Sequence, residues 1–210
     1  MLKKILLIAE FLVLFISFPL VVYTEWFFIP RIPALIVVSI YSLFILLRDK
    51  TFRSKKLINL DFNKRQLRTV MIRAAAVFFV LTILTWYIKP ELLFTFVKQR
   101  PIIWLVVMCL YPFFSAYPQE ILYRAFMFHR YKYLFAKSAV MILVSTATFS
   151  FLHIIYDNSP AIVLTLLGGY LFSKTYDKSK SLTLVSIEHA LYGMIVFTTG
   201  LGTYFYEGFR

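Results

Sequence analysis

The sequence is poor in charged residues, and this scarcity argues against a water-soluble protein. Asp, Glu, Lys and Arg make up 16% of its 210 residues, whereas a soluble globular domain carries about 25%. Hydrophobic residues make up 60% and aromatic residues 19%, and they occur in long runs rather than in alternation. Because this is too much apolar surface for a soluble globule, the composition predicts an integral membrane protein with several helices.

Cysteine is almost absent as well, which excludes most thiol chemistry. Cys109 is the single cysteine, so the chain has no intramolecular disulfide, zinc ribbon or thiol-redox motif. Its place inside an apolar run predicts a buried, inert thiol. The sequence also lacks the Gly-x-Ser-x-Gly elbow of serine hydrolases and the His-Glu-x-x-His motif of zinc proteases.

Acidic residues are the scarcest charged type, with 10 Asp and Glu against 23 Lys and Arg and a net charge of +13. The basic residues cluster in loops between apolar spans, so we expect membrane lipids rather than nucleic acid as partners. The positive-inside rule places the loop from Arg48 to Arg73 in the cytoplasm, together with the N-terminus two spans earlier. This loop contains nine basic residues: Arg48, Lys50, Arg53, Lys55, Lys56, Lys64, Arg65, Arg68 and Arg73.

The apolar runs predict an all-α fold, a polytopic membrane bundle of about seven transmembrane helices in which residues 1–210 form one membrane domain. The first run is interpreted as a retained helix rather than a signal peptide, because Glu10 interrupts it and no small-residue cleavage site follows. Pro112 and Pro118 are expected to kink or end the fourth helix, and Gln119–Phe135 to continue it as a further helix. The expected spans are Ile5–Tyr23, Ala34–Leu47, Val70–Ile88, Pro101–Tyr117, Ser138–Tyr156, Pro160–Phe172 and Leu182–Tyr204.

Three polar islands interrupt the apolar runs in the second half of the chain. Ionisable groups at membrane depth are costly, so they usually face a bundle interior or a wet cavity and mark function. Since the islands lie on three separate hydrophobic segments, they predict one shared polar site inside the bundle. They consist of Gln119, Glu120 and Arg124, of His153, and of Glu188 and His189.

Residue spacing within two of the islands places side chains on common helix faces. Glu120 and Arg124 are four residues apart, so the arginine could hold the glutamate ionised and oriented. The alternative is an ion pair at the membrane edge that only anchors the helix. Phe149 and His153 share a face in the same way, and for this histidine the alternative is a hydrogen-bonded structural role.

The third island lies one helical turn from a glycine. Gly193 is expected to leave open space beneath the His189 imidazole, and Glu188 is rotated from His189 by about 100° around the helix. The remaining histidine, His129, lies in the basic segment Phe128–Arg130 and is expected to be interfacial and non-catalytic.

A carboxylate and imidazoles around a water-filled pocket can hydrolyse a peptide bond. The carboxylate takes a proton from water, and an imidazole assists that transfer or stabilises the developing oxyanion. Two histidines and a glutamate could also make a three-ligand site for a divalent metal, with Glu120, His153 and His189 as candidate ligands.

The order of these motifs resembles the CPBP family, the CAAX-protease and bacteriocin-processing enzymes also called Abi. The family pattern is Glu-Glu-x-x-x-Arg, then Phe-x-x-x-His, then His-x-x-x-Asn or Asp. This chain has Gln119-Glu-x-x-x-Arg124, Phe149-x-x-x-His153 and His189-x-x-x-Gly193, and the resemblance covers a core of about residues 101–204.

The resemblance implies a polytopic intramembrane endoprotease in a bacterial inner (plasma) membrane, acting on a prenylated or leader-peptide substrate. In the family, the mechanism is described as glutamate-activated water or as metal-dependent. The positions that it assigns to catalysis are Gln119, His153 and His189. We add Glu120 as a candidate carboxylate, with Arg124, Glu188 and Phe149 in supporting roles.

Two departures from the family pattern bear on activity. Gln119 stands at the first glutamate position, and an amide cannot act as a general base. Glu120 is one residue later and would need a rotation of the helix to substitute. Gly193 stands at the Asn/Asp position. The chain therefore either uses Glu120, with Glu188, as its working carboxylate, or is a degenerate relative.

Three functional hypotheses follow. The favoured one is an enzyme, a CPBP-type membrane peptidase. The second is a catalytically silent relative that acts in peptide binding or bacteriocin self-immunity. The third is a proton-coupled transporter with Glu120, His153 and Glu188 as a relay, and it is disfavoured because the sequence shows no inverted repeat. Whether Glu120, His153 and His189 point into one cavity is the observation that discriminates best.

Overall fold

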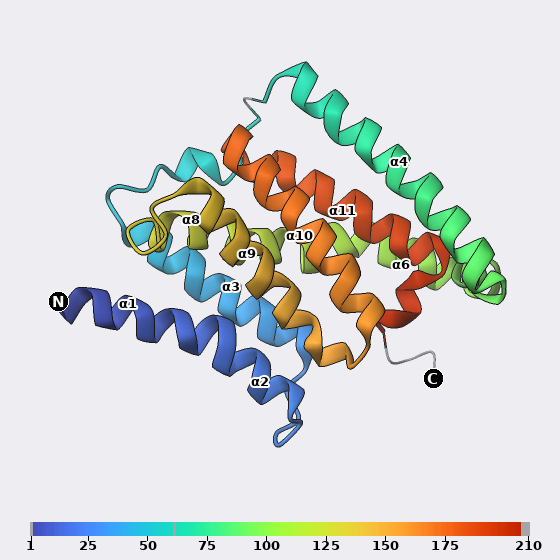
Figure 1. Ribbon diagram of the computed structural model, residues 1–210, viewed down its shortest axis with the longest axis horizontal. Helices are drawn as coiled ribbons and strands as arrows, with labels where there is room; N and C mark the ends of the chain where they lie inside the picture. Colours follow the sequence, from blue (N-terminus) through green and yellow to red (C-terminus); the bar gives the residue numbers. More distant parts are fainter. Residues whose placement is uncertain (1, 61, 207–210) are drawn as a thin grey trace.

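The fold is a bundle of helices, seen in a computed structural model that describes residues 2–60 and 62–206. No strand occurs in this described part of the chain. Figure 1 shows helix α4 along one edge of the molecule, helices α1 and α2 along the opposite edge, and α9, α10 and α11 between them. The all-α membrane bundle expected from the sequence is confirmed.

Six helical runs among the described residues are long and apolar enough to cross a membrane. A seventh span is not confirmed, because helix α10 (Ser159–Ser179) has the length but lacks the required apolar composition. It extends well past the expected end at Phe172 and packs against α9 and α11. The six runs are Leu2–Tyr23, Arg31–Arg48, Lys64–Ile88, Pro101–Arg130, Ser138–Tyr156 and Leu182–Thr199.

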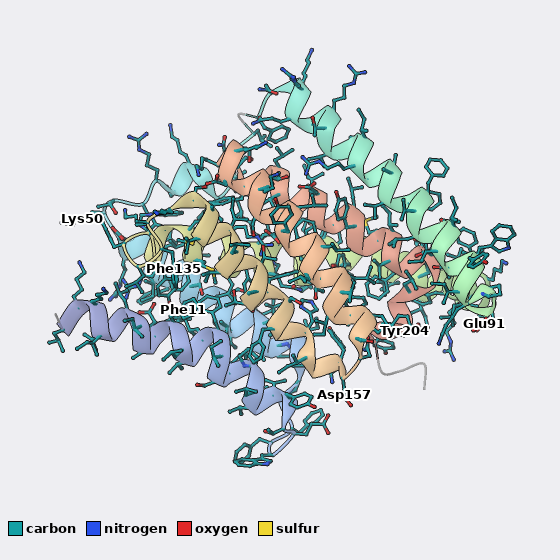
Figure 2. All side chains as sticks on the ribbon, viewed as in Figure 1. Phe11, Lys50, Glu91, Phe135, Asp157 and Tyr204 are labelled. Atoms are coloured by element: carbon teal, nitrogen blue, oxygen red, sulfur yellow. The ribbon has the colours of Figure 1, made fainter. Side chains whose placement is uncertain are left out.

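The first span combines α1 (Leu2–Leu12), a π-helical turn (Val13–Ser17) and α2 (Phe18–Tyr23). Glu10 within it is held by the protein: Arg130 donates to it at 3.1 and 2.6 Å, and the Tyr131 hydroxyl at 3.1 Å. Figure 2 shows Phe11 close to Phe135, with ring centroids 5.4 Å apart. These contacts fix the first span against the far end of the fourth. Helix α3 (Arg31–Arg48) follows.

The fourth span is one helical run that continues through both prolines, so neither proline ends it. It comprises α6 (Pro101–Tyr111), α7 (Tyr117–Glu120) and α8 (Met127–Arg130). Two π-helical segments, Pro112–Ala116 and Ile121–Phe126, join these helices. A π turn accommodates the backbone groups that a proline displaces, and such turns occur often at functional sites. The run ends at Arg130 rather than at Phe135.

Shorter elements and the last three long helices complete the fold. Helix α4 (Lys64–Ile88) begins at a capping box formed by Asn63 and Gln66. Helix α9 (Ser138–Leu152) ends in a 3₁₀ turn (His153–Tyr156), and α11 (Leu182–Thr199) is followed by another (Leu201–Tyr204). The remaining elements are the 3₁₀ turns Ser54–Lys56 and Pro90–Leu92 and helix α5 (Thr95–Gln99).

The interior lies where α9, α10 and α11 meet the fourth span, and its largest buried side chains include Arg124, Tyr123, Phe126 and Phe149. The outer faces expose large apolar side chains, as expected of surfaces that face lipid. Cys109 is on such an exposed face. The expected buried thiol is therefore wrong: its run is apolar because it faces outward, not because it forms the core.

Candidate active site

Glu120 and His189 form the centre of the candidate site. Glu120, at the end of α7, is fully buried. The Nδ1 atom of His189 on α11 lies 2.8 Å from Glu120 Oε1, and Arg124 Nε lies 3.2 Å from Glu120 Oε2 as an ion pair. Both carboxylate oxygens therefore have partners inside the bundle.

Arg124 is also fully buried, so its ion pair with Glu120 lies in the interior rather than at the membrane edge. Its Nη2 donates to the carbonyl oxygen of Gly169 at 3.2 Å. Its guanidinium carbon lies 4.8 Å from the ring centroid of Phe149 and 5.7 Å from that of Phe172. These contacts stabilise the buried charge, because aromatic faces attract cations.

His189 is enclosed by aromatic rings. It stacks on Phe172 at 4.6 Å, with Phe149 edge-on at 5.5 Å. The space beside Gly193, which was expected to be open, is filled by Tyr111. A Cβ atom added at Gly193 would overlap ring and hydroxyl atoms of Tyr111. The expectation of open space was wrong because the ring comes from the fourth span, far away in the sequence.

His153 lies on the other side of Phe149. Its Nδ1 is 2.8 Å from the Phe149 carbonyl oxygen, and its ring is 4.9 Å from the Phe149 ring. Since the His189 ring is 5.5 Å from the same phenyl ring, the two imidazoles flank one side chain. Glu120, His153 and His189 are thus brought together, although their assignment as catalytic residues stays a prediction.

Both imidazoles use Nδ1 for a hydrogen bond and leave Nε2 without one among the described residues. A carbonyl oxygen and an ionised carboxylate can only accept a hydrogen bond, so each Nδ1 carries the proton. Nε2 of His153, and Nε2 of neutral His189, then bears a lone pair. This is the tautomer that a proton acceptor at Nε2 requires.

Gln119 faces a different direction from Glu120. Its Nε2 donates to Ser115 Oγ at 2.9 Å, and it lines a pocket between the first two spans, the fourth span and the end of α9. We call this the Gln119–His153 pocket. Its volume of about 60 Å³ exceeds the roughly 10–15 Å³ needed for one water. Its other polar lining residues are Ser115, Tyr123, Tyr156 and Arg31.

Glu120 and His189 do not line this pocket, and neither does any other Asp or Glu of the described chain. The shared site consequently has two layers. Gln119 and His153 face the pocket, while Glu120, Arg124 and His189 lie in the packed interior.

Glu188 is not brought to this site. It is fully buried facing α4, where Arg73 Nη1 donates to its Oε1 at 2.9 Å and the Tyr192 hydroxyl at 3.2 Å. Its hydrogen-bond partners lie on α4 and α11 rather than around Glu120, and its supporting role stays a prediction. His129 lies outside the site as expected, with its Nε2 2.9 Å from Asp49 Oδ2.

The residues present do not fit a metal centre. Within the part of the chain that the structure describes, no group of three or more His, Cys, Asp or Glu side chains could hold an ion. The two oxygens of the Glu120 carboxylate are engaged by His189 and Arg124.

Sequence reasoning missed two residues that shape the site, Tyr111 and Phe172, and also missed Arg73 as the partner of Glu188. Each comes from a different helix and contacts its partner only through tertiary packing. Tyr111 and Phe172 are ordinary members of apolar runs, so nothing in the pattern distinguishes them. Arg73 had a visible signal, because this last residue of the basic run also lies inside the third span, where a charged side chain needs a partner.

Residues 98–195 match a family model described as type II CAAX prenyl endopeptidase Rce1-like. This match supports assigning the chain to the CAAX-protease (CPBP) family. No curated protein and no solved structure matches the chain. The matched segment contains all three polar motifs, so the site described above lies in the part that carries the family likeness. The family match supports an integral membrane location and CAAX-type peptidase chemistry.

Proposed function

We propose that the chain is an intramembrane endopeptidase that hydrolyses a peptide bond in the Gln119–His153 pocket. The observation that carries the proposal is the fixed tautomer of His153. The Phe149 carbonyl holds the proton on Nδ1, which leaves Nε2 as the proton acceptor of an imidazole that lines a water-sized pocket.

In this mechanism His153 acts where a carboxylate base was expected. Nε2 takes a proton from a water molecule as the water oxygen bonds to the peptide carbonyl carbon. The carbon–nitrogen bond then breaks, and the imidazolium returns the proton to the leaving nitrogen. Glu120 serves as a positioning residue, because it orients His189 and balances the Arg124 charge deep in the bundle.

Gln119 suits a different role from the glutamate that it replaces. Its amide has two N–H groups, and one of them donates to Ser115. The second can donate to the carbonyl oxygen of the substrate, where negative charge develops during attack. A glutamine here therefore stabilises the oxyanion and cannot accept the proton.

The pocket chemistry favours a hydrophobic peptide. Its lining is mostly apolar, with side chains such as Leu14, Phe18 and Leu152 beside the polar groups. A prenylated or leader peptide in a bacterial plasma membrane, entering from the lipid, would meet this surface first. The basic loop and the N-terminus would then face the cytoplasm.

A second function is favoured by the absence of a carboxylate from the described lining of the pocket. In that case the chain binds a peptide without cleaving it, as expected of a silent relative in bacteriocin self-immunity. Turnover then requires a carboxylate at position 119, which this chain lacks.

One experiment separates these functions. The purified protein is mixed in detergent with internally quenched peptides, one carrying a prenylated cysteine and one a hydrophobic leader sequence. We expect cleavage by the wild type, a loss of at least roughly 100-fold in His153→Gln, and no loss in the control His129→Gln. Melting temperatures of both variants show whether they remain folded.

The outcome with Gln119→Glu decides between the two functions. Cleavage by this variant alone would identify the natural chain as a silenced peptidase. Undiminished cleavage by folded His153→Gln would refute the role of His153 as base. Peptide binding without cleavage by either the wild type or Gln119→Glu would support the binding function.

A further inference from the structure

A second cavity lies away from the pocket, between the first turns of α4 and the end of α10. Its volume is about 200 Å³. Three cationic residues line it, Arg65 and Arg73 from α4 and Lys178 from α10, together with Thr69, Thr175 and Ser179, and most of its lining surface is apolar. We call it the Arg65–Lys178 cavity.

No Asp or Glu of the described residues lines this cavity. Arg65 and Lys178 are exposed side chains, and in the described chain neither has a carboxylate within ion-pair distance. Arg65 and Lys178 carry like charges on one concave surface and repel each other, and an anion between them removes that repulsion.

Arg73 extends from the cavity into the bundle. Its Nη1 donates to Glu188 at 2.9 Å and to Thr175 at 3.3 Å. The side chain is 33% exposed and belongs to the lining of the cavity. This partly buried cation is held in place by α11 and α10, which gives the cavity a pre-oriented donor.

The cavity lies at the end of α4 that joins the basic loop. The positive-inside rule places this end at the cytoplasmic leaflet, where anionic lipid headgroups are concentrated. Arginine and lysine donors beside hydroxyl groups suit the tetrahedral oxygens of a phosphate.

We infer that the Arg65–Lys178 cavity binds the phosphate group of an anionic phospholipid. This site is separate from the Gln119–His153 pocket, and its lipid binding does not depend on whether the chain cleaves peptides. The bound headgroup would bridge α4 and α10 through Arg65 and Lys178, so that anionic lipid stabilises the packing of α4 on the bundle.

The test measures lipid binding to the detergent-purified protein by native mass spectrometry, with thermal melting as a second readout. The probes are phosphatidylglycerol, phosphatidylcholine and inorganic phosphate. The test variant is Arg65→Gln/Lys178→Gln, and the matched control is Arg53→Gln/Lys55→Gln, which removes two exposed charges from the same basic loop. Arg73 is left intact because its loss would also leave Glu188 unpaired.

We expect phosphatidylglycerol to bind more tightly than phosphatidylcholine and to raise the melting temperature. The test variant should lose roughly 30-fold in affinity for phosphatidylglycerol, since each basic residue near an anionic headgroup contributes a factor of about 5. The control variant should bind as the wild type does.

The other results are equally decisive. In one outcome, inorganic phosphate competes with the lipid, and its binding is lost in Arg65→Gln/Lys178→Gln. That result would support a phosphate site in the cavity whose ligand can also come from solution. Equal binding of both lipids would overturn the proposal. So would a test variant that remains folded and keeps full affinity for phosphatidylglycerol.

Discussion

Replacing Glu120 with glutamine tests the buried ion pair most directly. Both Glu120 and Arg124 have fully buried side chains, so the variant leaves the arginine charge without its carboxylate. Breaking a buried pair by removing one partner costs about 3–5 kcal/mol. The glutamine can still accept the hydrogen bond from His189, and Arg124 keeps its contacts with Phe149 and Gly169. We therefore expect a loss near the lower limit, about 3 kcal/mol.

Such a loss lowers the folding equilibrium constant by roughly two orders of magnitude. It can be measured by reversible unfolding in mixed micelles with a denaturing detergent, followed by the fluorescence of the three tryptophans. Glu91→Gln, at an exposed carboxylate, is the matched control and should unfold as the wild type does.

A double variant shows whether the arginine charge is the cause. Replacing a buried ion pair with uncharged side chains is often neutral, so Glu120→Gln/Arg124→Met should recover most of the stability. The reasoning fails if Glu120→Gln loses less than about 1 kcal/mol, as an exposed pair would. It also fails if the double variant is no more stable than the single one.

Three further predictions concern packing, pH and topology. Gly193→Ala should destabilise by about 1–3 kcal/mol, because its Cβ would overlap the Tyr111 ring. In a Tyr111→Ala background the same substitution should change melting little, and unchanged melting of Gly193→Ala alone would contradict the packing. Hydrogen bonds from the Thr51 backbone and hydroxyl, and then from His129, lower the pKa of Asp49 below its ordinary 3.8. The ionised Asp49 carboxylate therefore stabilises the fold fully above pH 3.8, and this stabilisation is lost as the pH falls through its lower pKa in the folded protein. Melting curves recorded at decreasing pH should show this loss in the wild type but not in Asp49→Asn. An equal loss in both proteins would refute the linkage. Cysteines placed in loop 49–63 of a Cys109→Ser chain should resist an impermeant thiol reagent added outside intact cells, whereas strong labelling would reverse the orientation.

Much of the architecture was predictable from the sequence. Hydropathy adds up over some twenty residues per span, and the lipid requires each crossing segment to satisfy its own backbone, so the all-α membrane class followed from composition alone. The exception was the segment beginning at Pro160. Helix α10 extends to Ser179, and its polar residues 173–179 lower its apolar content below that of a spanning helix.

The candidate site was only partly predictable, for a geometric reason. The sequence placed Glu120, His153 and His189 on separate helices, and the cost of burying them indicated convergence. It could not say that Gln119 faces a pocket while Glu120 faces the interior. These adjacent residues lie between two π-helical segments, which shift the helical register away from the regular 3.6-residue period.

What the sequence by itself determined was the membrane class, most of the helical spans and the three motifs that carry the family likeness. These properties depend on residues close together along the chain. Only the tertiary structure decided that Tyr111 fills the space at Gly193 and that Arg73 pairs with Glu188. Those contacts join residues 82 and 115 positions apart on helices packed side by side, and no local pattern encodes which of many apolar or basic side chains will meet.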